Sequence, residues 1–333
     1  MTGGSPADDA ALALLLEVAG TPKPGNVDRH RDLADLRFES FLAGAVGARE
    51  GLERAARGAA VGHAFERAVA GMADRAGTNT QFGCLLLLVP LLRATRTGDL
   101  SPDGLDRVTR ATTVDDAVAF YRAFDRVDVA VGDPPEDATA LDVRRGADTE
   151  PVLRERGLTL RDVMATSASA GDGLDRVPDR NAQEWVEGFP RTFRAAEWIL
   201  ADEGPLTDRA ARAFLGLLGT EPDTLVATAH GPAAAREASA EARAVVSGAD
   251  PTTDADPTTP PDGTPSDGTP PDADAVHGID LDAAESLAAS FLERGINPGT
   301  TADLTCAALY VALRRGAETS EAGASRNGSE AEP

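Results

Sequence analysis

Residues 79–96 read NTQFGCLLLLVPLLRATR, in which a short polar cluster is followed by an unbroken apolar run from Cys84 to Leu92. Thr78 or Asn79 can cap a helix at this point, and the run is far shorter than the ~20 residues that cross a bilayer. A helix that is apolar on every side is typical of a protein core. We therefore expect residues 80–96 to form a buried helix.

Helical signals continue through the rest of the chain. Apolar residues spaced by three and four follow Asp35, which can cap them, and Thr113 can cap a helix from Val114 to Phe124. No segment alternates apolar and polar residues between turns, so the sequence predicts an all-α fold. Further helices are expected near residues 8–20, 62–75, 159–169, 181–200 with a break at Pro190, 206–218, 223–247, 281–294 and 301–315.

Two stretches interrupt this helical pattern. Residues 128–150 contain several prolines, glycines and acids and are expected to form a surface loop. Residues 249–275 consist almost wholly of Asp, Thr, Pro, Gly, Ser and Ala, which cannot bury enough apolar surface to offset the entropy of ordering. We expect a single helical domain over residues 8–316 that contains this segment as a disordered insert, followed by a disordered tail, 317–333.

The charge of the chain is strongly negative, at −23 for 333 residues, and this disfavours binding to nucleic-acid phosphate or anionic membranes. Lys23 is the only lysine, and every other basic residue is arginine. Molar salt would shorten the Debye length to about 3 Å and screen such self-repulsion. The composition therefore indicates a halophilic protein, with an acidic protein of ordinary habitat as the alternative.

The compartment is predicted from the cysteines and from the start of the chain. Cys84 and Cys306 both lie in apolar helical stretches, with no spacing typical of zinc sites or disulfide frameworks. No basic segment followed by an apolar one opens the chain, so no signal peptide is expected. We expect a cytoplasmic protein that does not enter a membrane.

The first candidate site is the segment TPKPGNVD, residues 21–28, between two predicted helices. Its prolines fix φ, and Gly25 allows a left-handed turn or a close approach to a ligand. Lys23 thus lies on a stiff loop, where a compact ammonium suits a phosphate oxygen. The alternative is an ordinary turn with an exposed lysine.

Polar side chains continue beyond this turn at Asp28, His30 and Asp32. Carboxylates at Asp28 and Asp32 could hold Mg²⁺ while leaving it several water ligands. A solvated acidic face is the competing interpretation in so acidic a chain.

A second site is predicted where Asn79 and Thr80 open the apolar helix, because the positive end of a helix suits an anion. A third lies at Glu184 and Glu187, which fall one helical turn apart and could divide general-base and metal roles. The alternative at Asn79 and Thr80 is simple N-capping of the helix. The alternative at Glu184 and Glu187 is a pair of glutamates on the surface.

The fourth candidate segment is NPGTTADL, residues 297–304, in which a Pro-Gly turn leads into a helix with Asp303 expected in its first turn. Asp303 there could also serve only the helix dipole. The chain contains no Walker A loop, dinucleotide-binding glycine pattern or nucleophile elbow.

Taken together and in order, these segments resemble the triphosphoribosyl-dephospho-CoA synthase family over about residues 10–315. The resemblance rests on four stretches: Glu17 with TPKPGNVD, then NTQFG at 79–83, the segment from Glu184 to Pro190, and NPGTTADL at 297–304. In the middle motif Gln81-Phe82 stands where family members carry a His-Lys pair. Late in the chain the family's Asp-Thr-Asn and Arg-Gly-Gly motifs survive only loosely, at residues 223–225 and 230–231.

The resemblance implies an all-α enzyme that transfers the triphosphoribosyl group of ATP to 3′-dephospho-CoA, releases adenine and serves prosthetic-group biosynthesis. Such a pentosyl transfer would use Mg²⁺ with ATP and a carboxylate to activate the acceptor hydroxyl. It implies catalytic roles for Asp28 or Glu184, with His30 as a proton donor.

The same resemblance implies nucleotide or substrate contacts, which are assigned to Lys23, Gly25, Asn79, Thr80, Asn297 and Asp303. Two alternatives stay open because the middle motif is altered. One is an enzyme of the same fold that uses another nucleotide or acceptor, and the other is a non-catalytic nucleotide-binding module.

Overall fold

The computed structural model describes residues 4–134, 136–169, 177–248 and 269–318, and it confirms the all-α fold. These residues form no β-strand, only one isolated bridge between Asp28 and Arg31. The helices are α1 (Pro6–Ala19), α2 (Phe38–Arg57), α3 (Val61–Ala76), α4 (Phe82–Arg96), α5 (Pro102–Arg110), α6 (Val114–Phe124), α7 (Glu150–Arg156), α8 (Leu160–Ser169), α9 (Arg180–Glu187), α10 (Pro190–Ala201), α11 (Leu206–Thr220), α12 (Thr224–His230), α13 (Pro232–Val246), α14 (Ala273–His277), α15 (Leu281–Arg294) and α16 (Gly299–Arg314), with 3₁₀ turns η1 (Glu136–Leu141) and η2 (Val143–Thr149).

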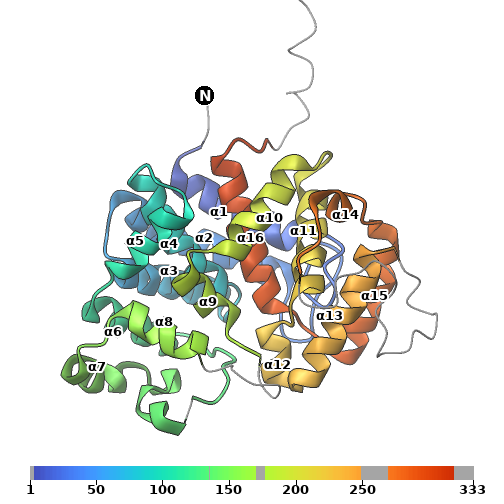
Figure 1. The fold of residues 1–333 in the computed structure, drawn as a ribbon. Coiled ribbons are helices and arrows are strands. Elements are labelled where there is room, and N and C mark those ends of the chain that lie inside the picture. Colours follow the sequence, from blue (N-terminus) through green and yellow to red (C-terminus); the bar gives the residue numbers. More distant parts are fainter. Residues whose placement is uncertain (1–3, 135, 170–176, 249–268, 319–333) are drawn as a thin grey trace, which may run out of the picture.

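Helix α16 runs through the middle of the molecule, where it packs against α1, α4, α10 and α11 (Figure 1). Its residues from Leu304 to Ala312 are all buried, as expected for a helix that is apolar on every side. The last helical element of the chain thus lies beside the first, and it carries Asp303 into the interior.

Helix α4 confirms the buried helix that was predicted from the apolar run. It begins at Phe82, whose backbone N–H donates to the Asn79 side-chain oxygen at 3.2 Å, so Asn79 is the capping residue. The hydroxyls of Thr95 and Tyr310 lie 2.7 Å apart and join α4 to α16. The starts of α4 and α16 are therefore held near each other.

Several predicted boundaries are confirmed and two are wrong. Thr113 caps α6 in a reciprocal capping box with Asp116, so the predicted start of this helix is confirmed. The helix expected over 223–247 is instead split into α12 and α13 at Gly231, whose φ is 87°. Asp35 does not cap α2, because the Phe38 N–H donates to Asp32 at 2.7 Å.

The segment 128–150 was predicted to be a surface loop, and this is only partly correct. The 3₁₀ turns η1 and η2 occupy most of it, and the Tyr121 hydroxyl donates to the Leu141 carbonyl at 2.6 Å. This contact fixes the segment against α6. Turn-forming residues marked the segment as irregular, but they did not reveal that a buried tyrosine anchors it.

The predicted insert, 249–275, lies largely outside the described residues, as does nearly all of the tail at 317–333. The described end of the insert is not disordered, because Asp272 caps the short helix α14 with a 2.8 Å bond from the Ala275 N–H. Beyond it α15 packs against α13 and α11, and α16 returns to the centre.

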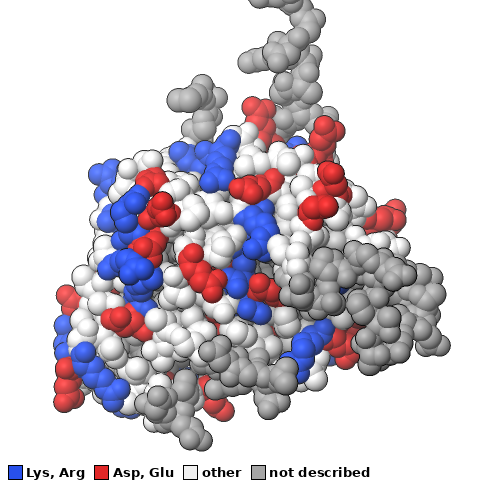
Figure 2. All heavy atoms as spheres, viewed as in Figure 1, with Lys and Arg blue, Asp and Glu red and all other residues white. Residues whose placement is uncertain are grey.

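The surface carries arginines beside carboxylates instead of broad patches of one sign on the face shown in Figure 2. Glu50 accepts from both Arg54 and Arg67 at 2.6 Å, and these bonds lower its pKa to about 2. Among the described residues, no helix is both long and apolar enough to span a membrane.

Candidate functional site

A cavity of about 400 Å³ opens where the starts of α4 and α16 meet the turn that follows α1. The predicted motifs 21–28, 79–83 and 297–304 all reach it. Its polar lining includes Glu17, Lys23, Asn26, Asn79, Thr80, Asp179, Asn181, Asn297 and Asp303, and its apolar lining includes Phe41, Phe82, Leu86, Phe120, Tyr121, Phe124, Leu141, Val143, Val163 and Met164.

The turn after α1 is held against the loop before α16 by a close backbone approach. Gly25 has a φ of 74°, and a Cβ on it would lie 1.8 Å from the Ile296 carbonyl oxygen. Asn26 donates from Nδ2 to the Pro298 carbonyl at 3.2 Å. Gly25 therefore acts at this site by letting two loops meet, since any other residue would push them apart.

Lys23 is buried on the wall of the cavity, with only 1% of its surface exposed. Its ammonium forms an ion pair with Glu17 from the last turn of α1. Burial raises the pKa of Glu17, while the charge of Lys23 opposes that rise. The alternative of an exposed lysine on a turn is thus excluded, and a positive charge is kept at the cavity surface.

Asp303 is partly buried and reaches the cavity from the second turn of α16, not the first, because the helix begins at Gly299. Asn181 donates to its Oδ2 at 2.8 Å and the Cys84 thiol contacts its Oδ1 at 3.2 Å. Burial outweighs these two bonds and raises the pKa of Asp303 to about 7. This carboxyl can therefore gain or lose a proton near neutral pH.

Two buried polar atoms of the cavity lining have no hydrogen-bond partner among the described residues. They are the Thr80 hydroxyl oxygen and the Asn181 side-chain oxygen, and both residues line the cavity. Such atoms cost about 1–3 kcal/mol each when nothing pairs with them. Groups of this kind are typical of a site that receives a polar ligand.

Part of the cavity wall is aromatic, although aromatic residues make up only 4% of the chain. The ring centroids of Phe82 and Phe124 lie 4.8 Å apart, and those of Phe120 and Phe124 lie 5.2 Å apart. Both pairs meet edge to face. A planar or apolar group could pack against this wall while a charged group reaches Lys23.

The cavity brings together five of the residues that the sequence singled out. Lys23, Asn79, Thr80, Asn297 and Asp303 all line it, while Gly25 lies just behind at the junction of the two loops. Their contacts with a substrate stay a prediction. The structure supplies the shared location that this prediction requires.

Asp28, His30 and Asp32, by contrast, are not among the residues that line the cavity. Asp28 is fully buried and accepts from the Thr21 hydroxyl and the His30 N–H at 2.8 Å, and from Arg31 at 3.0 Å. His30 is exposed, and Asp32 caps α2. The contacts of Asp28 shape the turn that carries Lys23 and leave no carboxylate oxygen facing the cavity.

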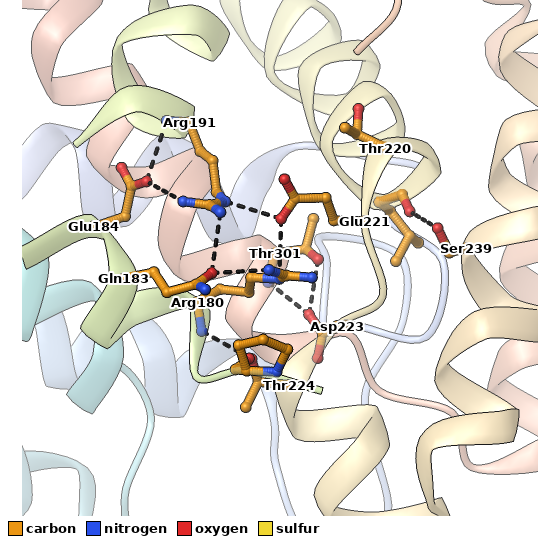
Figure 3. A network of polar contacts seen from close by, with 12 residues as sticks. Arg180, Gln183, Glu184, Arg191, Thr220, Glu221, Asp223, Thr224, Ser239 and Thr301 are labelled. Atoms are coloured by element: carbon orange, nitrogen blue, oxygen red, sulfur yellow. Dashed lines mark hydrogen bonds and ion pairs between the residues drawn. The ribbon is translucent and has the colours of Figure 1, made fainter. Parts of the chain in front are cut away.

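Glu184 also lies away from the cavity, in the polar network of Figure 3. Its two oxygens accept from the backbone N–H groups of Arg191 and Thr192 at 3.1 and 3.0 Å. Glu187 binds the Arg191 guanidinium at 2.8 Å. Burial raises the pKa of Glu184, although Arg191 opposes the rise. The carboxylate fixes the start of α10, so the four motifs do not all converge on one cleft.

The remainder of this network joins α12 to α16 (Figure 3). Glu221 bridges Arg180 and Arg191 at 3.0 and 2.9 Å. Asp223 caps α12 and also accepts from the backbone N–H and the hydroxyl of Thr301, both at 2.7 Å. These bonds fasten α16 two residues before Asp303.

Sequence reasoning did not assign roles to Asn181, Cys84 or the aromatic wall. Asn181 lies three residues before Glu184, and Cys84 was predicted only to lie in an apolar helical stretch. Glu17 was noted as part of the resemblance, and its position within the apolar run of α1 was a signal of a buried partner.

The cavity contains no ready-made metal cage. Within the described ranges, no three His, Cys, Asp or Glu side chains gather as a metal-ion site. Asp28 and Asp32, which were predicted to hold Mg²⁺, are engaged in a turn and a helix cap. The role of these two carboxylates in holding Mg²⁺ stays a prediction.

Comparison with known proteins was made with families, curated proteins and solved structures. The family model CitG, described as ATP:dephospho-CoA triphosphoribosyl transferase, matches residues 4–321. No curated protein matched. A crystal structure from Archaeoglobus fulgidus, described as a "putative triphosphoribosyl-dephospho-coA synthase", is similar with a TM-score of 0.59 and 23% identity, over 84% of this chain and 99% of that one. That similarity supports the fold.

Three motifs that lie far apart in the sequence line one cavity, which agrees with a family match that spans nearly the whole chain. The protein belongs to the CitG family of ATP:dephospho-CoA triphosphoribosyl transferases, and this membership indicates triphosphoribosyl-dephospho-CoA synthase activity.

Proposed function

We propose that the cavity is the active site in which the triphosphoribosyl group of ATP is transferred to dephospho-CoA and adenine is released. One observation carries this assignment: Lys23, the only lysine of the chain, is buried on the cavity wall within reach of the segments that carry Asn297 and Asp303. A buried ammonium is costly unless it is paired, and Lys23 pairs with Glu17 at the cavity wall.

The polar end of the cavity suits the triphosphate. Lys23 supplies a fixed positive charge, and the first turn of α4 adds the positive end of a helix dipole beside Thr80. The triphosphate is carried along in this reaction and not hydrolysed, so the site needs only to hold it. Asn79 and Asn297 would orient the ribose or the phosphates.

The aromatic end suits the purine ring or the pantetheine arm of the acceptor. Phe82, Phe120 and Phe124 form a continuous edge-to-face cluster there, and Met164 adds a flexible apolar side chain. Gln81, the residue before Phe82, is buried and donates to the Leu14 carbonyl at 3.1 Å. An acceptor other than dephospho-CoA is the second candidate, because this middle motif carries no cation.

Magnesium would enter this site as the companion of ATP. Mg²⁺ commonly uses one or two carboxylates together with phosphates and water, and it does not need a full protein cage. We place the reaction in a reducing cytoplasm with high salt, since both cysteines are buried free thiols and the chain is strongly acidic.

The test is adenine release by the purified protein in molar KCl with ATP and Mg²⁺, with and without dephospho-CoA. We expect release that requires dephospho-CoA and yields a product whose mass has gained the triphosphoribosyl group. ATP binding without adenine release would refute the assignment to dephospho-CoA. Stronger stimulation of adenine release by another nucleotide, with or without a thiol, would identify a different acceptor.

A further inference from the structure

We propose that Asp303 is the catalytic acid that protonates the departing adenine, a role that rests on the proposed function above. The family resemblance implied only a substrate contact for this residue. The cavity brings its carboxyl to the polar end, close to the region where Lys23 would hold the triphosphate.

The position of Asp303 is tightly fixed. Its Oδ2 accepts from Asn181 at 2.8 Å and its Oδ1 lies 3.2 Å from the Cys84 sulfur. A Cβ on Gly83 would lie 1.9 Å from Oδ2, so only glycine at this position of α4 leaves room for the carboxyl. A group held on three sides in this way is preorganised for proton transfer.

Asp303 also differs from other buried carboxylates in its charge environment. Glu17 pairs with Lys23, and Glu184 pairs with Arg191. Within the described ranges, Asp303 forms no ion pair with a lysine or arginine; its polar contacts are neutral donors. A largely buried carboxyl without a counter-ion favours its protonated form.

The titratable groups that face Asp303 favour the same form. Glu17 on α1 and Asp223 at the start of α12 are both acidic, and they add to the effect of burial. The thiols of Cys84 and Cys306 face it from α4 and α16 as neutral groups. The pKa of Cys84 is raised by its contact with Cys306 and by burial, and the pKa of Cys306 is raised by burial. Lys23 lines the same cavity, with its ammonium paired to Glu17.

The step balances without any additional reactant. The bond between C1′ and the adenine nitrogen breaks, its electron pair stays with the base, and the Asp303 proton neutralises the base as it leaves. The acceptor hydroxyl oxygen then bonds to C1′ and gives up its proton, which restores the acid form of Asp303. The net reaction is ATP plus acceptor to product plus adenine.

The experiment compares ATP with N7-methyl-ATP, whose purine already carries a positive charge and leaves as a neutral base without a proton. We expect Asp303→Asn to slow adenine release from ATP by about 100-fold or more, the usual contribution of a general acid. Release of 7-methyladenine should fall by less than about fivefold, after subtraction of spontaneous depurination. A merely structural role cannot produce this difference between the two nucleotides.

The matched control is Asp115→Asn on the exposed side of α6, whose carboxylate pairs with Arg154 at the surface and which should behave as the wild type with both nucleotides. Wild-type protein that releases neither base would overturn the proposed function and this proposal with it. An active wild type with an Asp303→Asn variant slowed equally on both nucleotides, per folded molecule, would overturn the proposal alone.

A second variant tests the same role without removing the acid. Cys84→Ala takes away a contact that stabilises the carboxylate form, so the pH at which wild-type activity with ATP declines should move upward in this variant. No such movement, in a variant that folds and turns over, would contradict proton donation by Asp303.

Discussion

The molecule buries carboxylates in two neighbouring regions, and it treats them differently. In the network of Figure 3, Glu184 and Glu221 each meet arginine, and Asp223 accepts four hydrogen bonds from Thr301 and from the first turn of α12. In the cavity, the described residues give Asp303 two hydrogen-bonding contacts, both from neutral groups. The carboxylates of the network are paired with cations or several donors, while Asp303 keeps capacity for a ligand.

The comparison indicates that the well-paired network stabilises α16, while the cavity keeps a carboxyl that lacks a counter-ion. Both regions act on α16, because Thr301 is fastened to Asp223 and Asp303 faces the cavity half a turn further on. The network therefore fixes the helix so that Asp303 can remain without a counter-ion. Strain or unmet polarity at a functional site is commonly offset by well-paired groups nearby.

The largest expected effect comes from Lys23→Met, which removes the cation from the cavity. Glu17 would be left buried without its partner, and the free energy of unfolding should fall by about 3–5 kcal/mol. Adenine release should be lost as well, because nothing else replaces the ammonium. Denaturant unfolding and an adenine-release assay measure the two effects separately.

The double variant Lys23→Met/Glu17→Gln separates folding from function. Since no uncompensated charge remains, most of the lost stability should return, while activity should not. Recovery of adenine release in the double variant would show that Lys23 only stabilises the fold.

The next effect is expected in the network, from Glu184→Gln. The charge-assisted bonds to the start of α10 would weaken, and the free energy of unfolding should fall by about 1–3 kcal/mol. Activity per folded molecule should stay within about twofold, because Glu184 does not reach the cavity. A loss of turnover as large as that of Asp303→Asn would instead restore Glu184 to the catalytic role that the motif suggested.

A smaller effect of Asp303 is expected in the way the free energy of unfolding changes with pH. Its pKa is about 7 in the folded protein against an ordinary value of 3.8. The folded state therefore keeps a proton that the unfolded state releases, and this stabilisation is full below pH ~4 and is lost as the pH rises through ~7. Relative to Asp303→Asn, the wild type should lose unfolding free energy between pH 5 and pH 8.

Urea unfolding of both proteins at several pH values in molar KCl gives this difference, in which the other titrating groups cancel. Parallel curves for the two proteins would mean that Asp303 ionises normally, and they would remove the physical basis for its acid role.

The fold was predictable because its signals are local. Capping by Thr113 and the apolar run from Cys84 to Leu92 depend on neighbouring residues, and the corresponding helices form as predicted. The site was harder because its contacts join distant segments. Asn181 meets Asp303, and Gly25 meets Ile296, across separations that no periodicity records.

The catalytic roles assigned to Asp28 and Glu184 stay a prediction, although neither residue lines the cavity. Asp28 and Glu184 occur in the same motifs as cavity residues, so sequence order alone could not separate groups that shape the loops from groups that face the ligand. Only their saturated hydrogen bonds make that separation. Lys23 could be singled out from the sequence because it is the only lysine in a chain whose other basic residues are arginines.

The smallest expected effect concerns the metal site predicted at the turn after α1. His30→Ala and Asp32→Asn alter an exposed side chain and a helix cap that an asparagine can still provide through its carbonyl oxygen. Stability should change by less than about 0.5 kcal/mol. The Mg²⁺ concentration that gives half-maximal adenine release should also stay the same, because neither residue lines the cavity. A many-fold rise in that concentration for Asp32→Asn alone would mean that this turn, and not the polar end of the cavity, holds the ion that accompanies ATP.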